Sequence, residues 1–470
     1  MKQTIIIDPV TRIEGHLKIA LDMDTDAHTG KNRVRTARAS GTMFRGMEKI
    51  LEGRDAFDAP IITARVCGVC PVSHAYAASI ALESSAAFTP PKNARLVRNL
   101  ILAANFLQSH ILHFYHLSLL DFMQGPSMPP WRPASKVDMR FNTVESEELF
   151  KHYDLALDMR RKTHSMGAIF GGHLPHPASI IPGGVTAVVS RERIDQYQGM
   201  LKEISQFGTE IYASDVELLA HTYPDYLQIG GGPENLIAYG VFVEEDSSSV
   251  TSAKRLFPGG VLFADGTREA LDSSQIMESV ACSWYEGPTG ATHPGSSKAS
   301  TTALYPKSGA YSWTKSPRYK TFAMEAGAFA RMKIAGLFGS EKRASVITRH
   351  QARVLEAKEL VRAMGRWLEQ LEVGGAVYEA LKLPASVSGF GALEAPRGAL
   401  GHWFTLVDGK FTSYQIITPT CINASPADEK GLPGAMEAAL AGTVITDSSD
   451  AVEALRVVHS FDPCLACAVH

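Results

Sequence analysis

The chain has 470 residues, of which 45% are hydrophobic and 20% charged, and its formal net charge is −3. These values are typical of a globular protein and exclude a disordered or fibrous chain. The near-neutral balance gives no electrostatic reason to expect a nucleic acid or an anionic membrane as partner. We expect one intertwined catalytic domain over 1–470, although length alone would also allow about two to four domains.

The N-terminal 60 residues are expected to be rich in β-structure. Apolar residues alternate over 4–22, which predicts a strand or hairpin, and a second strand-like run covers 34–40. The apolar stretch Ile5–Ile7 ends at Asp8-Pro9 and is too short for the core of a signal peptide.

A helical core is expected over 92–220. Its longest pattern starts at Lys92 and ends near Met123, with apolar residues at three- and four-residue steps. This stretch is also the best candidate for a membrane span, but Arg98, Asn99 and three histidines interrupt it, so no direct membrane span is expected. The other helices that we predict in the first half of the chain are 72–88, 145–166 and 191–220.

The second half is predicted to contain two further regions. Residues 225–320 are rich in glycine, proline, serine and aromatics, which indicates strands and loops in a mixed α/β lobe. Residues 322–470 are expected to continue the helical core and to end in a metal-binding segment, with a hairpin at 401–418 that turns at Asp408-Gly409. The helices expected there are 322–336, 350–373, 435–441 and 449–459. The predicted fold class is therefore mainly α with smaller α/β and β lobes.

Cysteine spacing gives the first indication of chemistry. Four of the six cysteines form two Cys-x-x-Cys pairs, Cys67 with Cys70 and Cys464 with Cys467. Each pair can direct two thiols at one point. Asp462-Pro463 is typical of a helix start, and a helix N-terminus would lower the pKa of Cys464 and favour its thiolate.

Three kinds of site agree with these pairs. A structural zinc site with four cysteines is common, but such sites usually close a short loop, whereas these pairs lie near opposite ends of the chain. A thioredoxin-like dithiol would need a βαβ pattern that neither pair has around it. The third kind is a redox metal centre, because soft thiolates suit nickel and iron as well as zinc. Spacing alone does not choose among them.

Several segments around the pairs resemble the large subunits of nickel–iron (NiFe) hydrogenases. They occur in family order along the whole chain: Asp8–His16, Phe44–Glu48, Arg65–Cys70, His110–Asp121, Glu394–His402, Tyr414–Pro426 and Asp462–His470. The resemblance implies the large-subunit fold with a core of long helices, and the reversible heterolytic cleavage of H2. Cys421 and Ile422 depart from the family pattern, where many relatives have Thr-Trp.

The resemblance implies a set of metal ligands. Cys67 and Cys464 would be terminal ligands of nickel, and Cys70 and Cys467 would bridge nickel to an iron that carries CO and two cyanides. Glu48, the carbonyl of Ile416 and His470 would bind Mg²⁺. Imidazole is a less usual ligand for magnesium, so the identity of this cation is left open.

Other residues would act around the metals. Arg397 would lie over their open side, near one cyanide, and would pair with Asp121 and Asp462. Thr420 would donate a hydrogen bond to the other cyanide, with Pro419 packed beside it. The proton would go to Cys464 or Arg397, and Glu14 would relay it outward from Cys464. The choice between these two bases is left open.

The cysteine count also predicts a partner. Only Cys282 and Cys421 remain beyond the two pairs, too few to ligate a usual iron–sulfur cluster. The resemblance names the electron acceptor as an iron–sulfur small subunit, which would carry any export signal. We therefore expect a periplasmic or membrane-associated location through that subunit. Because many family precursors carry a C-terminal tail beyond the position of His470, a maturation protease is a further expected partner. The alternatives are a zinc-binding protein and a quinone-reductase-type subunit.

Overall fold

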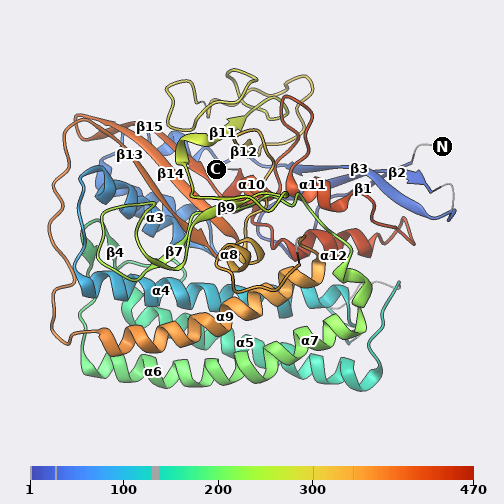
Figure 1. Cartoon of the computed structure of the whole chain (residues 1–470), viewed down its shortest axis with the longest axis horizontal. Helices are drawn as coiled ribbons and strands as arrows, with labels where there is room; N and C mark the ends of the chain where they lie inside the picture. Colours follow the sequence, from blue (N-terminus) through green and yellow to red (C-terminus); the bar gives the residue numbers. More distant parts are fainter. Residues whose placement is uncertain are drawn as a thin grey trace.

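The computed structural model describes residues 3–26, 29–126, 128–129, 137–299, 301–341 and 343–469. Helices dominate these residues, and several small sheets accompany them, as predicted. Figure 1 shows two layers: long helices lie side by side in the lower half, and the sheets and short helices lie above them. No helix in the described ranges is long and apolar enough to cross a membrane.

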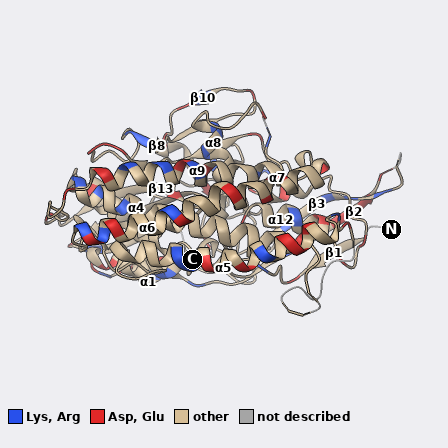
Figure 2. Cartoon of the chain, turned by 90° about the horizontal axis from the view of Figure 1, so that it is seen from below, with Lys and Arg blue, Asp and Glu red and all other residues tan. Residues whose placement is uncertain are grey.

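The lower layer is built around α4 (Lys92–Ile111), in which every residue from Asn93 to Ile111 is buried. Helix α4 packs against α5 (Thr143–Gly171) and α9 (Val346–Gln370). Outside them lie α6 (Arg191–Gln206) and α7 (Ala213–Thr222). These outer helices expose mixed charges: Lys and Arg alternate with Asp and Glu along the helices that face the viewer in Figure 2. The amphipathic patterns therefore predicted the bundle well.

Two of the predicted long helices change their winding in the middle. After α4, the chain continues as a π-helical segment, Leu112–Ser118, and a 3-10 turn, Leu119–Asp121. The predicted helix over 191–220 is α6 and α7 joined by a second π-helical segment, Phe207–Tyr212. Such wide turns are rare and often occur beside functional sites. Hydrophobic spacing does not reveal them, because apolar residues recur in much the same way on either winding.

Two three-stranded antiparallel sheets form the main β-structure. The N-terminal sheet contains β1 (Thr4–Ile7), β2 (Leu17–Thr25) and β3 (Asn32–Gly41). The second contains β13 (Val387–Ala395), β14 (Gly398–Val407) and β15 (Lys410–Ile417). The predicted hairpin is β14–β15, turning at Asp408-Gly409, and β13 was missed.

The second sheet packs on α3 (Pro71–Ser85) at very short range. A Cβ atom added to Gly391 would lie 2.5 Å from the Ala77 carbonyl oxygen. Glycine is therefore required where β13 crosses this helix. The close contact joins the helix that follows the first cysteine pair to the sheet that carries Arg397.

The region 225–320 differs from the mixed α/β lobe that its composition suggested. Its described part, 225–299 and 301–320, contains short strands and 3-10 turns but no α-helix. Glycine and proline recur too often there for a helix to extend. The short strands in and near this region are β4 (Ile180–Ile181), β5 (Gly184–Val185), β6 (Leu236–Ala238), β7 (Val241–Val243), β8 (Arg255–Phe257), β9 (Gly260–Leu262), β10 (Arg268–Glu269), β11 (Ile276–Ser279) and β12 (Ser316–Tyr319).

Short helices connect the two layers. The helix expected at 322–336 is limited to α8 (Ala328–Ile334), because Gly327 before it has φ 135° and cannot belong to a helix. The others are α1 (Met47–Leu51), α2 (Ala59–Thr63), α10 (Pro419–Asn423), α11 (Ala435–Leu440), α12 (Val452–Ser460) and α13 (Leu465–Ala468).

The two ends of the chain are interlaced in the interior. The main chain of Glu14 pairs with that of Cys464, and the Leu465 N–H donates to the Glu14 carbonyl at 2.7 Å. Gly15 has φ 84°, and a Cβ there would lie 2.4 Å from the Ala466 nitrogen. This close approach brings the second cysteine pair against the N-terminal segment.

Candidate metal centre

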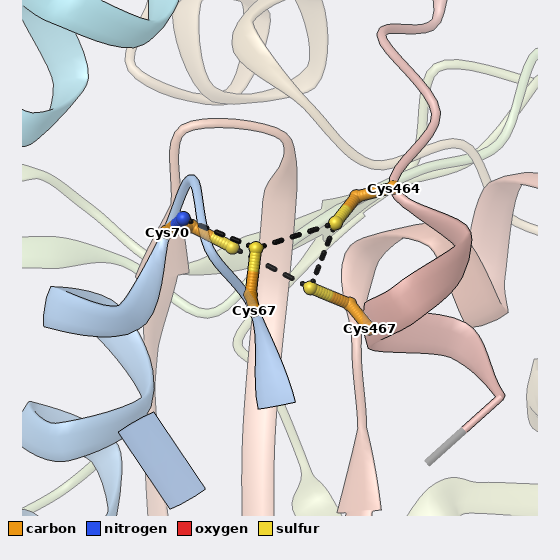
Figure 3. Close-up of side chains that lie close together, drawn as sticks. All are labelled: Cys67, Cys70, Cys464 and Cys467. Atoms are coloured by element: carbon orange, nitrogen blue, oxygen red, sulfur yellow. Dashed lines mark hydrogen bonds between the residues drawn. The ribbon is translucent and has the colours of Figure 1, made fainter. Parts of the chain in front are cut away.

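The two cysteine pairs meet in the interior. The Sγ atoms of Cys67, Cys70, Cys464 and Cys467 all lie within 4.8 Å of one another, and all four residues are buried. The Sγ–Sγ distances are 3.4 Å for Cys67–Cys464, 3.5 Å for Cys70–Cys467 and 2.9 Å for Cys464–Cys467 (Figure 3). Within the described ranges, no other group of three or more Cys, His, Asp or Glu residues has the spacing of a metal site.

The first pair is set by the turn that precedes α3. Cys67 is extended after a 3-10 turn, and Cys70 is the residue before the helix, with Pro71 at its first position. The Cys67 sulfur accepts the main-chain N–H groups of Val69 at 3.2 Å and Cys70 at 3.1 Å. Main-chain donors of this kind stabilise a thiolate.

The second pair is held differently from the prediction. Asp462 has φ 55°, and α13 begins only at Leu465, with Cys464 as the preceding residue. Asp462-Pro463 is therefore not the helix start, because the Asp462 side chain binds Arg397 instead of capping α13. The Cys464 N–H donates to the Thr420 hydroxyl oxygen at 3.0 Å.

The thiols of Cys67, Cys464 and Cys467 differ in the direction in which their surroundings shift the pKa. Burial raises the pKa of Cys464 and of Cys467 well above the ordinary value. Burial also acts against the Cys67 thiolate, but hydrogen bonds from the other three thiols hold the pKa of Cys67 well below its usual range. The expected lowering for Cys464 was thus wrong, because desolvation outweighs any effect of the short helix α13. A cation that binds all four sulfurs must displace several protons.

Arg397 extends from the tip of a hairpin toward this cluster. Its Nε donates to the Asp462 carbonyl at 2.9 Å, and its Nη2 lies 3.0 Å from Asp462 Oδ1. Although burial acts in the opposite direction, Asp462 and the nearby thiolates raise the pKa of Arg397 well above its ordinary value. Its Nη1 is buried without a hydrogen-bond partner among the described residues. A buried cation with a free donor suits an acceptor atom bound at the sulfur cluster.

The predicted pairing of Asp121 with Arg397 is wrong. Asp121 forms an ion pair with Arg12, and its Oδ2 lies 2.5 Å from His459 Nδ1. Burial works against ionisation of Asp121, but Arg12 and His459 lower its pKa to about 2. Asp121 therefore fastens the N-terminal segment to α12, since Arg12 reaches the carboxylate that the sequence assigned to Arg397.

Pro419 and Thr420 lie next to the second cysteine pair, at the start of α10. Thr420 is buried, and its oxygen already accepts the Cys464 N–H, so its hydroxyl hydrogen is available to donate. Cys421, which departs from the family pattern, accepts the Thr418 hydroxyl at 3.2 Å and lies 3.6 Å from the Ala468 carbonyl. It therefore lies on α10 with its sulfur against α13.

Glu14 lies beside Cys464 and is half-buried. Burial, together with the negative charge on Cys67, raises the pKa of Glu14 above its usual value. A carboxyl group of this kind can accept a proton more readily than a fully solvated one.

Glu48 occupies a second buried polar site. Its Oε1 accepts the Ile416 N–H at 2.7 Å, and its Oε2 lies 3.4 Å from both Lys315 Nζ and Gln415 Nε2. Sequence reasoning missed Lys315 and Gln415. The position of Gln415 beside Ile416 was an available signal, whereas nothing in the local sequence of Lys315 indicates a contact with residue 48. The prediction for His470 lies outside the described residues.

Arg45 is a further residue whose role the sequence did not reveal. Its guanidinium donates to the carbonyls of Arg65, Val66 and Ala466, and its N–H donates to the Val469 carbonyl at 3.1 Å. It thereby ties the segments of the two cysteine pairs together. Its place in the Phe44–Glu48 motif was the available signal.

Comparison with known proteins gives a consistent result. The family model described as nickel-dependent hydrogenase matches residues 45–147 and 134–470, and a model described as HoxL-like matches residues 4–38. The periplasmic [NiFeSe] hydrogenase large subunit of Desulfomicrobium baculatum is 37% identical over 100% of this chain and 95% of its own. The uptake hydrogenase large subunit of Bradyrhizobium diazoefficiens is 31% identical over 99% of this chain and 95% of its own chain.

Solved structures agree in fold over the same extent. A [NiFeSe] hydrogenase structure from Dm. baculatum has a TM-score of 0.93 and 37% identity, covering 100% of both chains. The reduced Ni-Fe-Se hydrogenase of D. vulgaris Hildenborough gives the same values. Those relatives are named for selenium, whereas this chain has cysteine at all four sulfur positions.

Proposed function

The chain belongs to the nickel-dependent hydrogenase family as a large, catalytic subunit, and from this premise we propose roles for the residues of its site. Its reaction is the reversible heterolytic cleavage of H2 into protons and electrons at a nickel–iron centre. Cys67 and Cys464 would hold nickel, and Cys70 and Cys467 would be shared between nickel and iron. The observation that carries this assignment is the convergence of four buried thiols from the two chain ends.

The residues present fit a nickel–iron group that carries CO and two cyanides. Soft thiolates are suitable ligands for both metals. When bound, this group supplies the centre at which H2 is split. Arg397 and Thr420 each have a buried donor available, the former at Nη1 and the latter at its hydroxyl, and these donors would hold the cyanides. Pro419 packs beside Thr420.

The proton leaves through this chain's own side chains. Asp462 and the thiolates hold the pKa of Arg397 well above the ordinary value, against the effect of burial, so its guanidinium remains protonated. We therefore assign the accepting base to the Cys464 thiolate and an orienting role to Arg397. Glu14, whose main chain pairs with Cys464, carries the proton outward.

A hard cation is proposed for the Glu48 site. Glu48, the carbonyl of Ile416 and His470 are the protein ligands, and Mg²⁺ is the ion that oxygen ligands together with water favour. The position of Lys315 3.4 Å from Glu48 Oε2 means that this ammonium competes with the ion or contacts its water molecules.

Electrons pass to an iron–sulfur small subunit. The four clustered cysteines leave only Cys282 and Cys421, and the latter is enclosed between α10 and α13, so this chain cannot ligate such a cluster by itself. The relative from Dm. baculatum is periplasmic. We propose the same location, or attachment to a membrane through the small subunit.

We also propose that 1–470 is a single intertwined domain. One hydrophobic cluster includes buried residues from Ile5 to Ala468, and the two chain ends are hydrogen-bonded to each other. Such an arrangement does not divide into segments that could bury separate cores.

Elemental analysis combined with infrared spectroscopy tests the proposed metal centre. We expect nickel and iron in equal amounts, together with stretching bands of CO and cyanide. One zinc per chain without these bands would contradict the proposal and would support a structural zinc site instead. Magnesium is measured in the same sample.

A further inference from the structure

We propose that Arg331 is a positioning residue that holds the Pro396-Arg397 turn so that the Arg397 guanidinium faces the cysteine cluster. The proposal rests on the function assigned to Arg397 above. Arg331 lies on α8, outside the short motifs named in the sequence analysis.

The turn that carries Arg397 is very tight. In the register of β13 and β14, Ala395 pairs with Gly398, so Pro396 and Arg397 alone connect the two strands. Gly398 has φ 136°, and a Cβ there would lie 2.8 Å from both the Ala326 Cβ and the Gly327 nitrogen. The turn therefore packs directly against the residues that precede α8, and position 398 has no space for a residue larger than glycine.

Arg331 binds the carbonyl groups of this turn. Its Nη1 donates to the Ala395 carbonyl at 3.1 Å, and its Nη2 donates to the Pro396 carbonyl at 2.8 Å. These carbonyls belong to the two peptide units that precede Arg397. Fixing them sets the direction in which the Arg397 side chain leaves the turn.

Arg331 is itself fixed by two carboxylates. Its Nε and Nη2 donate to Glu356 on α9 at 2.5 and 2.6 Å, and its Nη1 donates to Glu394 on β13 at 2.7 Å. These three bonds to carboxylates and the two bonds to carbonyls together use all five N–H groups of the Arg331 guanidinium. Arg331 is fully buried. A guanidinium satisfied in this way has one orientation, and a lysine with three donors cannot reproduce it.

The carboxylates are held in turn by the surrounding elements. Glu356 Oε2 lies 2.8 Å from His110 Nε2 on α4, and Glu394 Oε1 accepts the Tyr239 N–H at 2.6 Å. The network thus connects the helix bundle to the hairpin. Arg397 depends on this support, because its hydrogen bonds within the described chain all go to Asp462 and leave Nη1 unpartnered.

Arg98 offers a matched control. It is equally buried, forms a two-point ion pair with Glu83 at 3.0 and 2.7 Å, and donates to the Ile181 and Gly184 carbonyls. It does not contact the turn of Arg397. A purely structural role would make substitutions of Arg98 and Arg331 equivalent.

The test compares Arg331→Lys with Arg98→Lys in the complete large and small subunit complex. We expect both variants to lower Tm similarly and to keep nickel and iron. Only Arg331→Lys should shift the cyanide stretching bands and lower kcat for H2 oxidation, by about 10- to 100-fold, because displacements near 1 Å at a catalytic group have effects of that size. Identical bands and kcat in the two variants would overturn the proposal.

Two further measurements keep the proposal testable. If Arg331→Lys fails to fold, Glu394→Gln loosens one of the five bonds and should shift the same bands by a smaller amount, and unshifted bands would overturn it. In an Arg397→Lys background, Arg331→Lys should have almost no additional effect on kcat; an undiminished effect would show that Arg331 does not act through Arg397. Absence of nickel and of the cyanide bands from the wild-type protein would instead refute the proposed function.

Discussion

The cysteine cluster and the Glu48 site are two buried polar groups that the chain satisfies in different ways. The four thiols contact mainly one another, at Sγ–Sγ distances of 2.9 to 3.5 Å, and accept a few main-chain N–H groups. Glu48 instead accepts the Ile416 N–H at 2.7 Å and lies beside the ammonium of Lys315.

This difference bears on how each site depends on a cation. Thiols are weak hydrogen-bond donors and acceptors, so a soft metal can replace their protons without breaking strong contacts. A carboxylate that already has a main-chain donor and an ammonium is largely compensated, and a hard cation has to displace or reorganise Lys315. We therefore expect strong dependence on metal at the sulfur cluster and weaker dependence at Glu48.

The largest effect should follow from removal of one clustered sulfur. Cys70→Ser replaces a proposed bridging thiolate by a hydroxyl that binds soft metals poorly. We expect nickel and iron to fall to background and H2 oxidation to be abolished, as measured by elemental analysis and hydrogen uptake. Cys282→Ser is the control and should retain both. Full metal content in Cys70→Ser would remove Cys70 from the ligand set.

Glu14→Gln separates proton transfer from metal binding at the same cluster. Glutamine keeps the size of the side chain but cannot carry the proton, so exchange between H2 and D2O should fall by about 10²-fold or more. Nickel and iron content should remain normal. The exposed residue Glu52 provides a control through Glu52→Gln. Wild-type exchange in Glu14→Gln would exclude Glu14 from the proton path.

Arg397→Lys tests the cation at the edge of the cluster. Lysine keeps the charge but cannot bind Asp462 through two nitrogens and also direct a third donor at the bound group. Loss of one such donor typically costs about 10² to 10³ in turnover. We expect a decrease of this size in kcat, with both metals retained. Unchanged turnover would reject a role for Arg397 in the reaction.

How far the sequence predicted these features depends on the range of the interactions. The helices α4, α5 and α9 follow from apolar spacing, and the four cysteines follow from short motifs, because both signals are local. The partner of Asp121 was wrong because Arg12 reaches it from a segment 109 positions away.

The remaining differences have the same origin. Asp462 has a left-handed conformation and its carboxylate binds Arg397, so the helix start that the sequence suggested does not form in the folded chain. Lys315 and Gln415 approach Glu48 from distant loops and strands. Sequence motifs thus identified the residues of the sulfur cluster, whereas the contacts that orient them required the folded chain.

The smallest expected effect concerns the ammonium beside Glu48. Lys315→Met removes a positive charge 3.4 Å from the carboxylate while keeping much of the side-chain volume. Without this competitor, Mg²⁺ should bind about tenfold more tightly, or ~1.4 kcal/mol. Equilibrium dialysis of the chelator-treated complex against magnesium measures the change, and Lys298→Met at an exposed position is the control. Weaker binding in Lys315→Met would mean that Lys315 supports the ion through its water molecules, and the contrast between the two sites would then disappear, since each would be built to receive its metal.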